Sequence, residues 1–374
     1  MGLTSNKVLM LAMVIAVALF FGTVWLWPGL ARQNWRAVSG RVGLLLGTQL
    51  ALFATVGLAA NQAFGFYASW ADLFGQETGQ GVVVDHIAEG GNSSVQVVST
   101  SRVLGASSAL PQMAGQIQKV DIIGRTTHLA TPAFVYLPPE YFQPQNRAHK
   151  FPVSVVLTGY PGTAQALVDK LHYPSTAQQL ARNGKMQPMI LVMLRPTVAP
   201  PRDTECVDVP GGPQTETFFA KDLRDAVVAR YRVDKTPASW GIVGDSTGGY
   251  CALKIAVHYP RAYAAAAGLS PYYKAPIDPT TGDLFRGNKN LQNRADLFWA
   301  LKHLPAPETS LLVTTSKVGE HNYKDTLKFI KSVQDTNVTR ISSIILPSGG
   351  HNFNTWKREI PPMLQWMSER LVAH

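Results

Sequence analysis

Two long apolar stretches without charged side chains stand near the start of the chain, at residues 8–27 and 42–67. Each is long enough to cross the hydrocarbon core of a bilayer as a helix. A cleaved signal peptide is the alternative for the first stretch, but its apolar run is longer than a signal core and residues 25–28 (WLWP) offer no small-residue cleavage site. The pattern predicts a transmembrane hairpin within residues 1–70.

The segment between the two apolar stretches is basic. It contains Arg32, Arg36 and Arg41, whereas only Lys7 precedes the first stretch and acidic side chains follow the second. Short loops rich in arginine stay on the cytoplasmic side of a membrane. The chain after residue 70 is therefore predicted to lie outside the cytoplasm, in a multi-pass protein of the cell membrane.

The next residues, 71–116, are rich in Gly, Ser, Gln and Ala and carry only short apolar runs. This composition favours a linker or a loosely packed arm.

From residue 117 to 374, short apolar runs alternate with segments of helical periodicity. Several runs, such as residues 153–158 and 189–194, show no apolar–polar alternation, as expected when both faces of a strand are covered. The other predicted strands are residues 120–123, 133–137, 240–243, 264–269, 311–315 and 341–346, and the predicted helices are 176–183, 217–230, 249–258, 324–333 and 356–371. This order predicts an α/β domain with a mostly parallel sheet and helices on both faces.

Two long stretches interrupt this alternation, residues 196–215 and 270–293, both rich in Pro and Gly. Loops of that length inside a compact domain usually shape a site. We expect them to form the walls of a substrate site, with Asp203 as a substrate-binding residue.

The whole chain of 374 residues has a net charge of +10, with 46% hydrophobic and 16% charged residues. The apolar excess comes from the two N-terminal stretches. The charges of the remainder are scattered, without a basic run interleaved with aromatic residues, so we predict no nucleic-acid partner. A mildly basic domain beside an anionic membrane accounts for the charge.

A G-x-S-x-G sequence, residues 244–248, follows the apolar run 240–243 and leads directly into a helical segment. A turn this sharp between strand and helix leaves no room for side chains two positions before and after its centre, which is why glycine is needed at both. The turn exposes the Ser246 hydroxyl at the carboxyl edge of the sheet. We predict that Ser246 is a nucleophile, with a purely structural turn as the alternative.

The partners of a nucleophilic serine in this order are an acid and then a histidine, each following a later strand. His351 follows the strand ending at residue 346, after two glycines, and is the predicted general base. Glu320 follows the strand 311–315 and is the predicted acid, with Asp325 as its rival. His258, near the end of the helix after Ser246, is predicted to be a capping or surface residue.

An oxyanion hole needs backbone amides beside the nucleophile. The amide of Thr247, at the helix start, is one predicted donor, and the amide of Tyr160, after the strand 153–158, is the second. An ordinary strand-end turn is the alternative at Tyr160.

The two cysteines are Cys206, in the first long loop, and Cys251, in the first turn of the helix after Ser246. Both should lie at the carboxyl edge of the sheet, so in an oxidising compartment they could pair. Two unpaired buried thiols are the alternative.

Several of these segments together resemble a known family. They are residues 135–139 (VYLPP), Gly159-Tyr160, residues 244–249 (GDSTGG), and Gly350-His351 followed by Trp356. They are similar to the putative-esterase family of α/β hydrolases, which includes esterase D-type enzymes and the antigen 85 mycolyltransferases. With its hairpin, the whole chain resembles membrane-anchored esterase-like proteins of actinobacteria.

The resemblance implies the α/β-hydrolase fold and a triad of Ser246, His351 and Glu320, with the amides of Tyr160 and Thr247 as oxyanion hole. Trp356 is placed by the same resemblance among the substrate-binding residues. The implied activity is that of a carboxylesterase or acyltransferase on lipid or sugar esters of the cell envelope. It proceeds through an acyl-enzyme and needs no metal or organic cofactor.

Three other functions compete with this prediction. They are a serine peptidase of the same fold, a hydrolase of plant-wall esters, and a non-catalytic membrane-tethered interaction protein.

Overall fold

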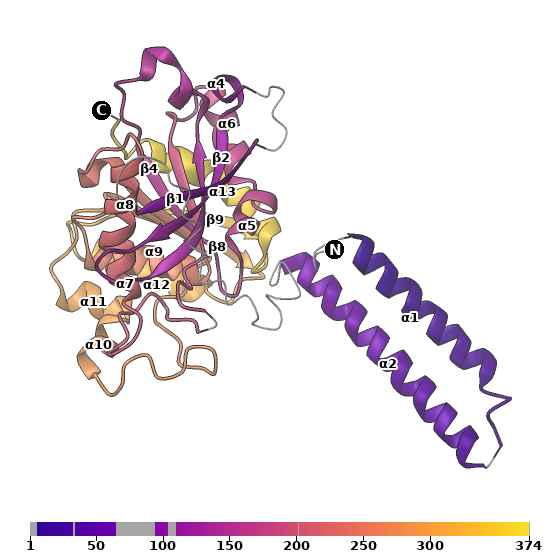
Figure 1. Cartoon of the computed structure of the whole chain (residues 1–374). Coiled ribbons are helices and arrows are strands. Elements are labelled where there is room, and N and C mark those ends of the chain that lie inside the picture. Colours follow the sequence, from indigo (N-terminus) through magenta and orange to yellow (C-terminus); the bar gives the residue numbers. More distant parts are fainter. Residues whose placement is uncertain (1–5, 33, 65–93, 104–109, 201, 374) are drawn as a thin grey trace. The chain divides into compact units, whose positions relative to one another are not determined.

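The structure is a computed structural model that describes residues 6–32, 34–64, 94–103, 110–200 and 202–373 (Figure 1). The chain divides into two compact units, residues 1–78 and 79–374.

The first unit is a pair of helices, α1 (Asn6–Leu26) and α2 (Trp35–Phe64). They pack against each other, and the hydroxyl oxygens of Thr23 and Thr48 lie 3.0 Å apart between them. Their outward faces are apolar, with side chains such as Phe53 78% exposed. The segments Lys7–Leu26 and Trp35–Gln62 are long and apolar enough to cross a membrane, properties that a helix so near the N-terminus shares with a signal sequence.

The second helix begins earlier than the sequence pattern predicts. Arg36 and Arg41 lie in its first two turns rather than in the preceding loop. The side chain of Asn34 explains the difference, because its Oδ1 accepts a hydrogen bond from the amide of Ala37, 2.8 Å away, and so caps the helix start. Residues 65–67 of the predicted second span lie outside the described residues.

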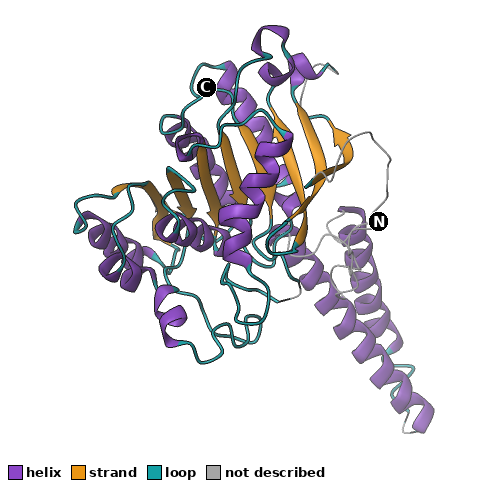
Figure 2. Cartoon of the chain, turned by 60° about the vertical axis from the view of Figure 1, so that its left-hand side comes forward, coloured by secondary structure: helices purple, strands orange, loops and turns teal. Residues whose placement is uncertain are grey.

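The second unit is built on a nine-stranded sheet (Figure 2). The strands are β1 (Val95–Ser101), β2 (Gln116–Ile123), β3 (Ala130–Leu137), β4 (Val153–Leu157), β5 (Ile190–Leu194), β6 (Trp240–Asp245), β7 (Ala265–Leu269), β8 (Ser310–Val318) and β9 (Arg340–Ser348). They lie in the order β1-β2-β3-β5-β4-β6-β7-β8-β9. The six strands from β4 to β9 are parallel, which confirms the predicted mostly parallel sheet.

The antiparallel edge of the sheet departs from the prediction. β1, β2 and β3 run antiparallel to their neighbours, and β1 lies within residues 71–116, which were predicted to be a linker. The sequence signal of β1 is weak because it is an edge strand whose residues are mostly polar and exposed, with Val95 alone fully buried. The folded unit therefore begins before residue 117, and residues 71–93 of the predicted linker lie outside the described residues.

Helices cover both faces of the sheet (Figures 1 and 2). The described helices of this unit are α4 (Pro111–Ala114), α5 (Ala164–Asp169), α6 (Tyr173–Arg182), α7 (Thr215–Thr217), α8 (Leu223–Arg230), α9 (Thr247–His258), α10 (Lys289–Arg294), α11 (Leu297–His303), α12 (Tyr323–Gln334) and α13 (Phe353–Ser368). A π-helical turn, Phe218–Asp222, joins α7 to α8, so the predicted helix 217–230 is one interrupted helix. Short 3₁₀ turns occupy Pro139–Phe142, Pro144–Asn146 and Pro237–Ser239.

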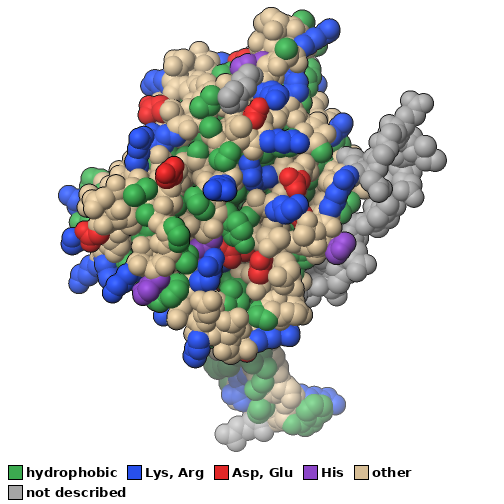
Figure 3. Space-filling view, turned by 90° about the vertical axis from the view of Figure 1, so that its left-hand side faces the viewer, with side chains coloured by type: hydrophobic (Ala, Val, Ile, Leu, Met, Phe, Trp, Pro, Cys, Tyr) green, Lys and Arg blue, Asp and Glu red, His purple; other side chains and the backbone are tan. Residues whose placement is uncertain are grey.

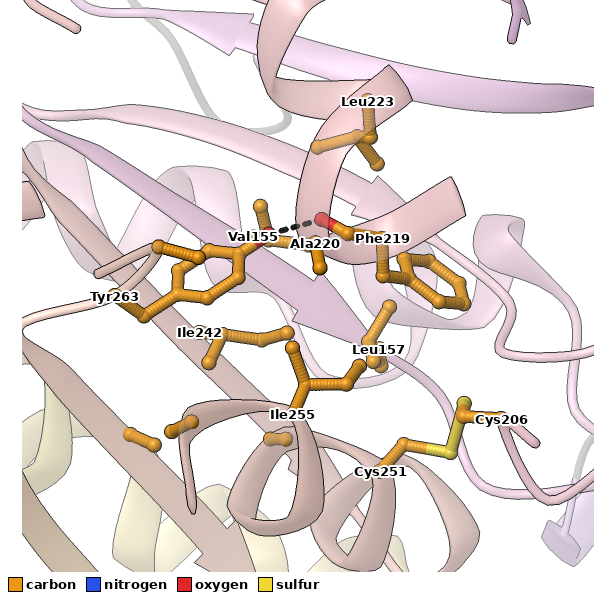
Figure 4. Close-up of a cluster of buried hydrophobic side chains, with 14 of the residues drawn as sticks. Val155, Leu157, Cys206, Phe219, Ala220, Leu223, Ile242, Cys251, Ile255 and Tyr263 are labelled. Carbon is orange, nitrogen blue, oxygen red and sulfur yellow. Dashed lines mark hydrogen bonds between the residues drawn. A yellow bond between two sulfur atoms is a disulfide. The ribbon is translucent and has the colours of Figure 1, made fainter. Parts of the chain in front are cut away.

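Two hydrophobic cores follow from this arrangement, one on each face. Side chains alternate along the central strands, so that Val155 and Ile242 pack with α8, α9, α11 and α12, whereas Val156 and Val243 pack with α5, α6 and α13. Figure 4 shows part of the first core, where Ile255 of α9 and Phe219 meet the central strands. These cores fix the carboxyl ends of β4, β6, β7, β8 and β9, where the predicted site residues are located.

Candidate active site

Ser246 stands at the sharp turn between β6 and α9. Its backbone angles are φ 53° and ψ −119°, a conformation that side chains other than glycine rarely adopt. Its amide donates to the carbonyl of Leu269 at the end of β7, 2.9 Å away, which holds the turn against the sheet. The hydroxyl is thereby fixed at the carboxyl edge.

The two glycines that flank this turn are sterically required, as the sequence predicts. A Cβ on Gly244 would lie 2.3 Å from the backbone carbon of Gly248. A Cβ on Gly248 would lie 2.5 Å from the carbonyl oxygens of Leu157 and Thr158. Helix α9 can approach β4 and β6 this closely only because both positions lack side chains.

His351 reaches Ser246 from the loop after β9. The distance from its Nε2 to the hydroxyl oxygen of Ser246 is 2.8 Å, within hydrogen-bond range. Trp356 contacts the imidazole edge-on, with ring centroids 5.2 Å apart, and supports one side of it. The histidine side chain is 48% exposed, so the pair is accessible from solvent.

Glu320 lies on the other side of the imidazole, in the loop between β8 and α12. Its Oε2 is 3.6 Å from Nδ1 of His351, and its side chain is only 1% exposed. Its Oε1 accepts a hydrogen bond from the Ser270 hydroxyl at 2.7 Å. The rival acid, Asp325, is exposed in the first turn of α12, so the structure brings Glu320 and not Asp325 to the histidine.

The loop after β4 passes directly over the nucleophile. A Cβ on Gly159 would lie 3.0 Å from the Cβ of Ser246, so glycine allows this close approach. Tyr160 follows, half-buried, and its peptide bond to Pro161 is cis. Thr247 is the first residue of α9, where backbone amides have no intrahelical partner. Thr247 thus directly follows Ser246 in the chain, and Tyr160 directly follows Gly159, the residue that closely approaches Ser246.

Asp245, which the sequence did not single out, connects the nucleophile turn to the loop after β4. Its Oδ2 accepts a hydrogen bond from the Gly159 amide at 2.8 Å, while its Oδ1 is buried without a partner among the described residues. Burial raises the pKa of this carboxyl to about 7, against the opposing effects of the Gly159 amide and of His351. The side chain therefore ties the loop after β4 to the nucleophile turn.

Replacing Asp245 by asparagine should make stability less dependent on pH. An acid whose pKa is raised on folding keeps its proton in the folded state, so the wild-type protein loses stability as pH rises from about 4 to about 7. The variant cannot lose a proton there. Its free energy of unfolding relative to wild type should increase by up to about 4 kcal/mol over this range and then level off.

Chemical denaturation at a series of pH values measures this difference, with the exposed Asp325→Asn as the matched control. Other buried acids contribute equally to the wild-type and variant proteins and cancel. A difference that stays constant between pH 4 and 7 would contradict the raised pKa of Asp245.

The two long loops are joined to each other beside the site. Arg202 donates to the carbonyl of Thr281 at 2.7 Å and to that of Asp283 at 2.6 Å, and the amide of Asp203 donates to the carbonyl of Thr280 at 3.2 Å. A disulfide between Cys206 and Cys251, with Cα atoms 5.7 Å apart, fastens the first loop to α9 (Figure 4). The predicted pairing of the cysteines is confirmed, and the alternative of two free thiols is wrong.

Two residues predicted to bind substrate are buried instead. Asp203 is 2% exposed and its carboxylate accepts from the Glu205 amide, because the loop folds back on itself at this point. Trp356 is 6% exposed and donates its indole N–H to the Ser270 hydroxyl at 2.9 Å. Both side chains support the loops around the site, and neither offers a surface to a substrate.

Glu205 is a buried acid in the same loop. It accepts a hydrogen bond of 2.5 Å from the Tyr272 hydroxyl, which links the two long loops again. Burial and the neighbouring Asp203 raise the pKa of Glu205 to about 8, so it is largely neutral at pH 7.

His258 is neither a surface residue nor part of the site. Its Nδ1 lies 2.5 Å from the carboxylate of Glu216 and its Nε2 lies 3.0 Å from the carbonyl of Arg294, and its side chain is 2% exposed. Lys254 lies on the other side of Glu216, at 3.6 Å, and donates to the carbonyl of Cys206. This buried cluster anchors the first long loop to α9, away from Ser246.

Among the residues that the structure describes, no group of three or more His, Cys, Asp or Glu side chains could hold a metal ion.

Charged side chains of both signs are interspersed on the face shown in Figure 3.

Besides Asp245, three polar residues near the site were not predicted from the sequence: Ser270, Thr314 and Glu359. Ser270 directly follows β7, the neighbour of the nucleophile strand, so its place at a strand's carboxyl end was a usable signal. Thr314 lies inside β8 and Glu359 inside α13, where only the register of packed elements brings them together.

A family model described as "Putative esterase" matches residues 125–367 of the chain. An uncharacterized protein of Corynebacterium glutamicum is 24% identical over 259 residues, which are 64% of this chain and 58% of that protein's length. The chain thus spans less than two thirds of this curated relative.

Solved structures of similar fold include three hydrolases. A ferulic acid esterase has a TM-score of 0.59 and 17% identity, covering 69% of this chain and 99% of its own. An S-formylglutathione hydrolase from Agrobacterium tumefaciens has a TM-score of 0.58 and 16% identity, covering 74% and 100%. The fluorophosphonate-binding serine hydrolase F of Staphylococcus aureus has a TM-score of 0.55 and 19% identity, covering 68% and 98%. At these identities the likeness concerns the fold, and it confirms the predicted fold class.

Proposed function

The chain belongs to the putative esterase family, and from this premise we propose that it is a membrane-anchored serine esterase with Ser246 as its nucleophile. One observation carries the proposal: the hydroxyl of Ser246, on a strained turn at the carboxyl edge of the sheet, lies 2.8 Å from Nε2 of His351. A serine in this setting with a base in hydrogen-bond contact is poised for acyl transfer.

The reaction begins when Nε2 of His351 takes the hydroxyl proton of Ser246 as the oxygen attacks an ester carbonyl. Glu320, buried beside Nδ1, stabilises the imidazolium that forms. The amides of Thr247 and Tyr160 donate to the oxyanion of the tetrahedral intermediate. The imidazolium then protonates the leaving alcohol, and an acyl group remains on Ser246.

Water or a sugar hydroxyl, deprotonated by His351, then attacks the acyl carbon of the acyl-enzyme. The bond from the acyl carbon to the Ser246 oxygen breaks, and the imidazolium returns its proton to that oxygen. With water the enzyme is a carboxylesterase, and with a sugar hydroxyl it is an acyltransferase of the mycolyltransferase kind. Both reactions use the same residues and need no cofactor, and we propose hydrolysis as the basal activity because it requires no acceptor site.

The proposed substrates are lipid or sugar esters of the cell envelope. Two features support this choice: the apolar N-terminal helices, which would hold the enzyme at a bilayer, and the buried disulfide, which is typical of compartments outside the cytoplasm. In this topology α1 and α2 cross the membrane and the catalytic unit is outside. Arg32, between the two helices, and Arg36 and Arg41, in the first turns of α2, then face the cytoplasm.

The decisive experiment labels the full chain, purified in detergent, with a fluorophosphonate probe that reacts with activated serines. Wild-type protein should be labelled and should hydrolyse short acyl esters, and Ser246→Ala should do neither. Ser348→Ala, which removes an exposed hydroxyl near His351, is the control and should behave as wild type.

Undiminished labelling of Ser246→Ala would overturn the assignment of the nucleophile, and no labelling of the wild type would favour a non-catalytic tethered protein. Cleavage of peptide amides at rates comparable to esters would favour a peptidase. Thin-layer chromatography of envelope lipids from a strain lacking the gene, compared with its parent, identifies the acyl donor.

A further inference from the structure

A second buried carboxyl lies behind Glu320. Glu359, in the middle of α13, is fully buried, and its Oε2 accepts a hydrogen bond of 2.7 Å from the hydroxyl of Thr314 in β8. A glutamate facing a parallel sheet is unusual, because burying a charged side chain is costly unless it is paired.

Hydrogen bonds connect this carboxyl to the site without interruption. The hydroxyl oxygen of Thr314 accepts from the amide of Ser270 at 3.0 Å. The hydroxyl of Ser270 in turn donates to Oε1 of Glu320 at 2.7 Å, and its oxygen accepts from the indole of Trp356 at 2.9 Å. These three bonds hold Ser270 by its amide and its hydroxyl in the orientation that donates to Glu320.

The surroundings of Glu359 favour its neutral form. Its Oε1 has no hydrogen-bond partner within the described part of the chain, so a full negative charge there would be poorly solvated. Glu320 adds a like charge nearby, and Tyr173 of α6 presents a neutral phenol. The hydrogen bond from Thr314 and, to a smaller degree, Arg358 act in the opposite direction and lower the pKa of Glu359, but burial outweighs them. Burial, together with Glu320, raises the pKa of Glu359 to about 8.

We propose that Glu359, acting through Thr314 and Ser270, positions the carboxylate of Glu320 against His351, and that it does so as a neutral acid. This inference rests on the proposed function, because it assigns positioning residues to the same triad. Glu320 sits on a loop and has two equivalent oxygens. Pinning Oε1 to Ser270 leaves Oε2 directed at Nδ1 of the imidazole. Glu359 itself does not contact the reacting atoms.

The hydroxyl of Thr314 gives the first test. Thr314→Val keeps the shape of the side chain but leaves the Ser270 amide and the Glu359 carboxyl without their partner. We expect kcat for ester hydrolysis to fall by roughly tenfold or more with KM unchanged, because the interaction affects the transition state and not substrate binding. Thr326→Val is the matched control, since it also removes a buried hydroxyl bonded to one side chain, the Tyr273 hydroxyl at 2.9 Å.

The charge of Glu359 gives the second test. Glu359→Gln is neutral at every pH and can still accept from Thr314, so kcat at pH 7 should stay within about threefold of wild type, whereas Glu359→Leu should lose roughly tenfold. Above pH 8 ionised Glu359 repels Glu320 in the wild type, and kcat should decline there. In Glu359→Gln this decline should be absent. Circular dichroism melts check that each variant is folded.

Three outcomes would overturn the positioning role. They are equal kcat values for Thr314→Val and Thr326→Val, a loss in Glu359→Gln as large as in Glu359→Leu, or identical alkaline limbs in Glu359→Gln and wild type. Failure of the proposed function has a different signature: either the wild type shows neither ester hydrolysis nor probe labelling, or Ser246→Ala keeps both.

Discussion

Replacing His351 by alanine is expected to lower kcat for ester hydrolysis by roughly 10⁴- to 10⁶-fold, the largest effect we predict for any substitution outside Ser246. The imidazole is the only base in hydrogen-bond contact with the Ser246 hydroxyl among the described residues. Without it the hydroxyl, whose proton is very weakly acidic, cannot attack at neutral pH. Initial rates with a short-chain ester measure the loss, and folding is checked by thermal melts.

His321→Ala provides the control for His351→Ala. His321 is an exposed histidine directly after Glu320, so its replacement removes a neighbouring imidazole without touching the Ser246 pair. Residues that act as one unit have non-additive effects, so the double variant Ser246→Ala/His351→Ala should be no slower than Ser246→Ala alone. A His351→Ala enzyme with a rate within tenfold of wild type would show that another group is the base.

Removing the disulfide is expected to lower the free energy of unfolding by about 4 kcal/mol. Cys206 and Cys251 are 45 residues apart, and the estimate is the chain entropy that a cross-link of this span removes from the unfolded state. Both cysteines are fully buried, so Cys206→Ala/Cys251→Ala avoids placing an unpaired hydroxyl in the core. Denaturant titration of the full chain in detergent measures the change.

The wild-type protein in reducing agent is the second arm of this experiment. It should unfold at nearly the same denaturant concentration as the double alanine variant, because both lack the same cross-link. The first long loop should also become the preferred site of proteolysis in both. An unfolding midpoint unaffected by reduction would mean that the buried cluster of Lys254, Glu216 and His258 holds the loop without help from the disulfide.

The central part of the fold could be predicted because its signals are local. Apolar strands covered on both faces, such as β4 and β5, stand out against amphipathic helices, and the glycines around Ser246 mark the turn. The antiparallel edge of the sheet was harder to predict. β1 is mostly exposed and polar, so its pairing with β2 depends on a partner that the local sequence does not reveal. Helix α2 begins earlier than predicted because the side chain of Asn34 caps its first turn.

The residues of the site also fall into those that local sequence signals predict and those that they do not. Ser246, Glu320 and His351 each follow a strand, so the topology of a parallel sheet was enough to bring them to one edge. Asp203 and Trp356 were predicted to face the substrate, but both side chains are buried. Which way such a side chain faces depends on how the loops pack. Glu359 and Thr314 meet through the register of α13 against β8, which no spacing in the sequence encodes.

The links between the two long loops also bear on how specificity could be re-engineered. Arg202 of one loop is held by carbonyl oxygens of the other, and Tyr272 and Glu205 join them a second time. In a chimaera that takes only one of the two loops from a homologue, the guanidinium of Arg202 and the buried carboxyl of Glu205 would lose their hydrogen-bond partners in the other loop. The two long loops, together with Cys206 and Cys251, are therefore the smallest unit that can be transplanted.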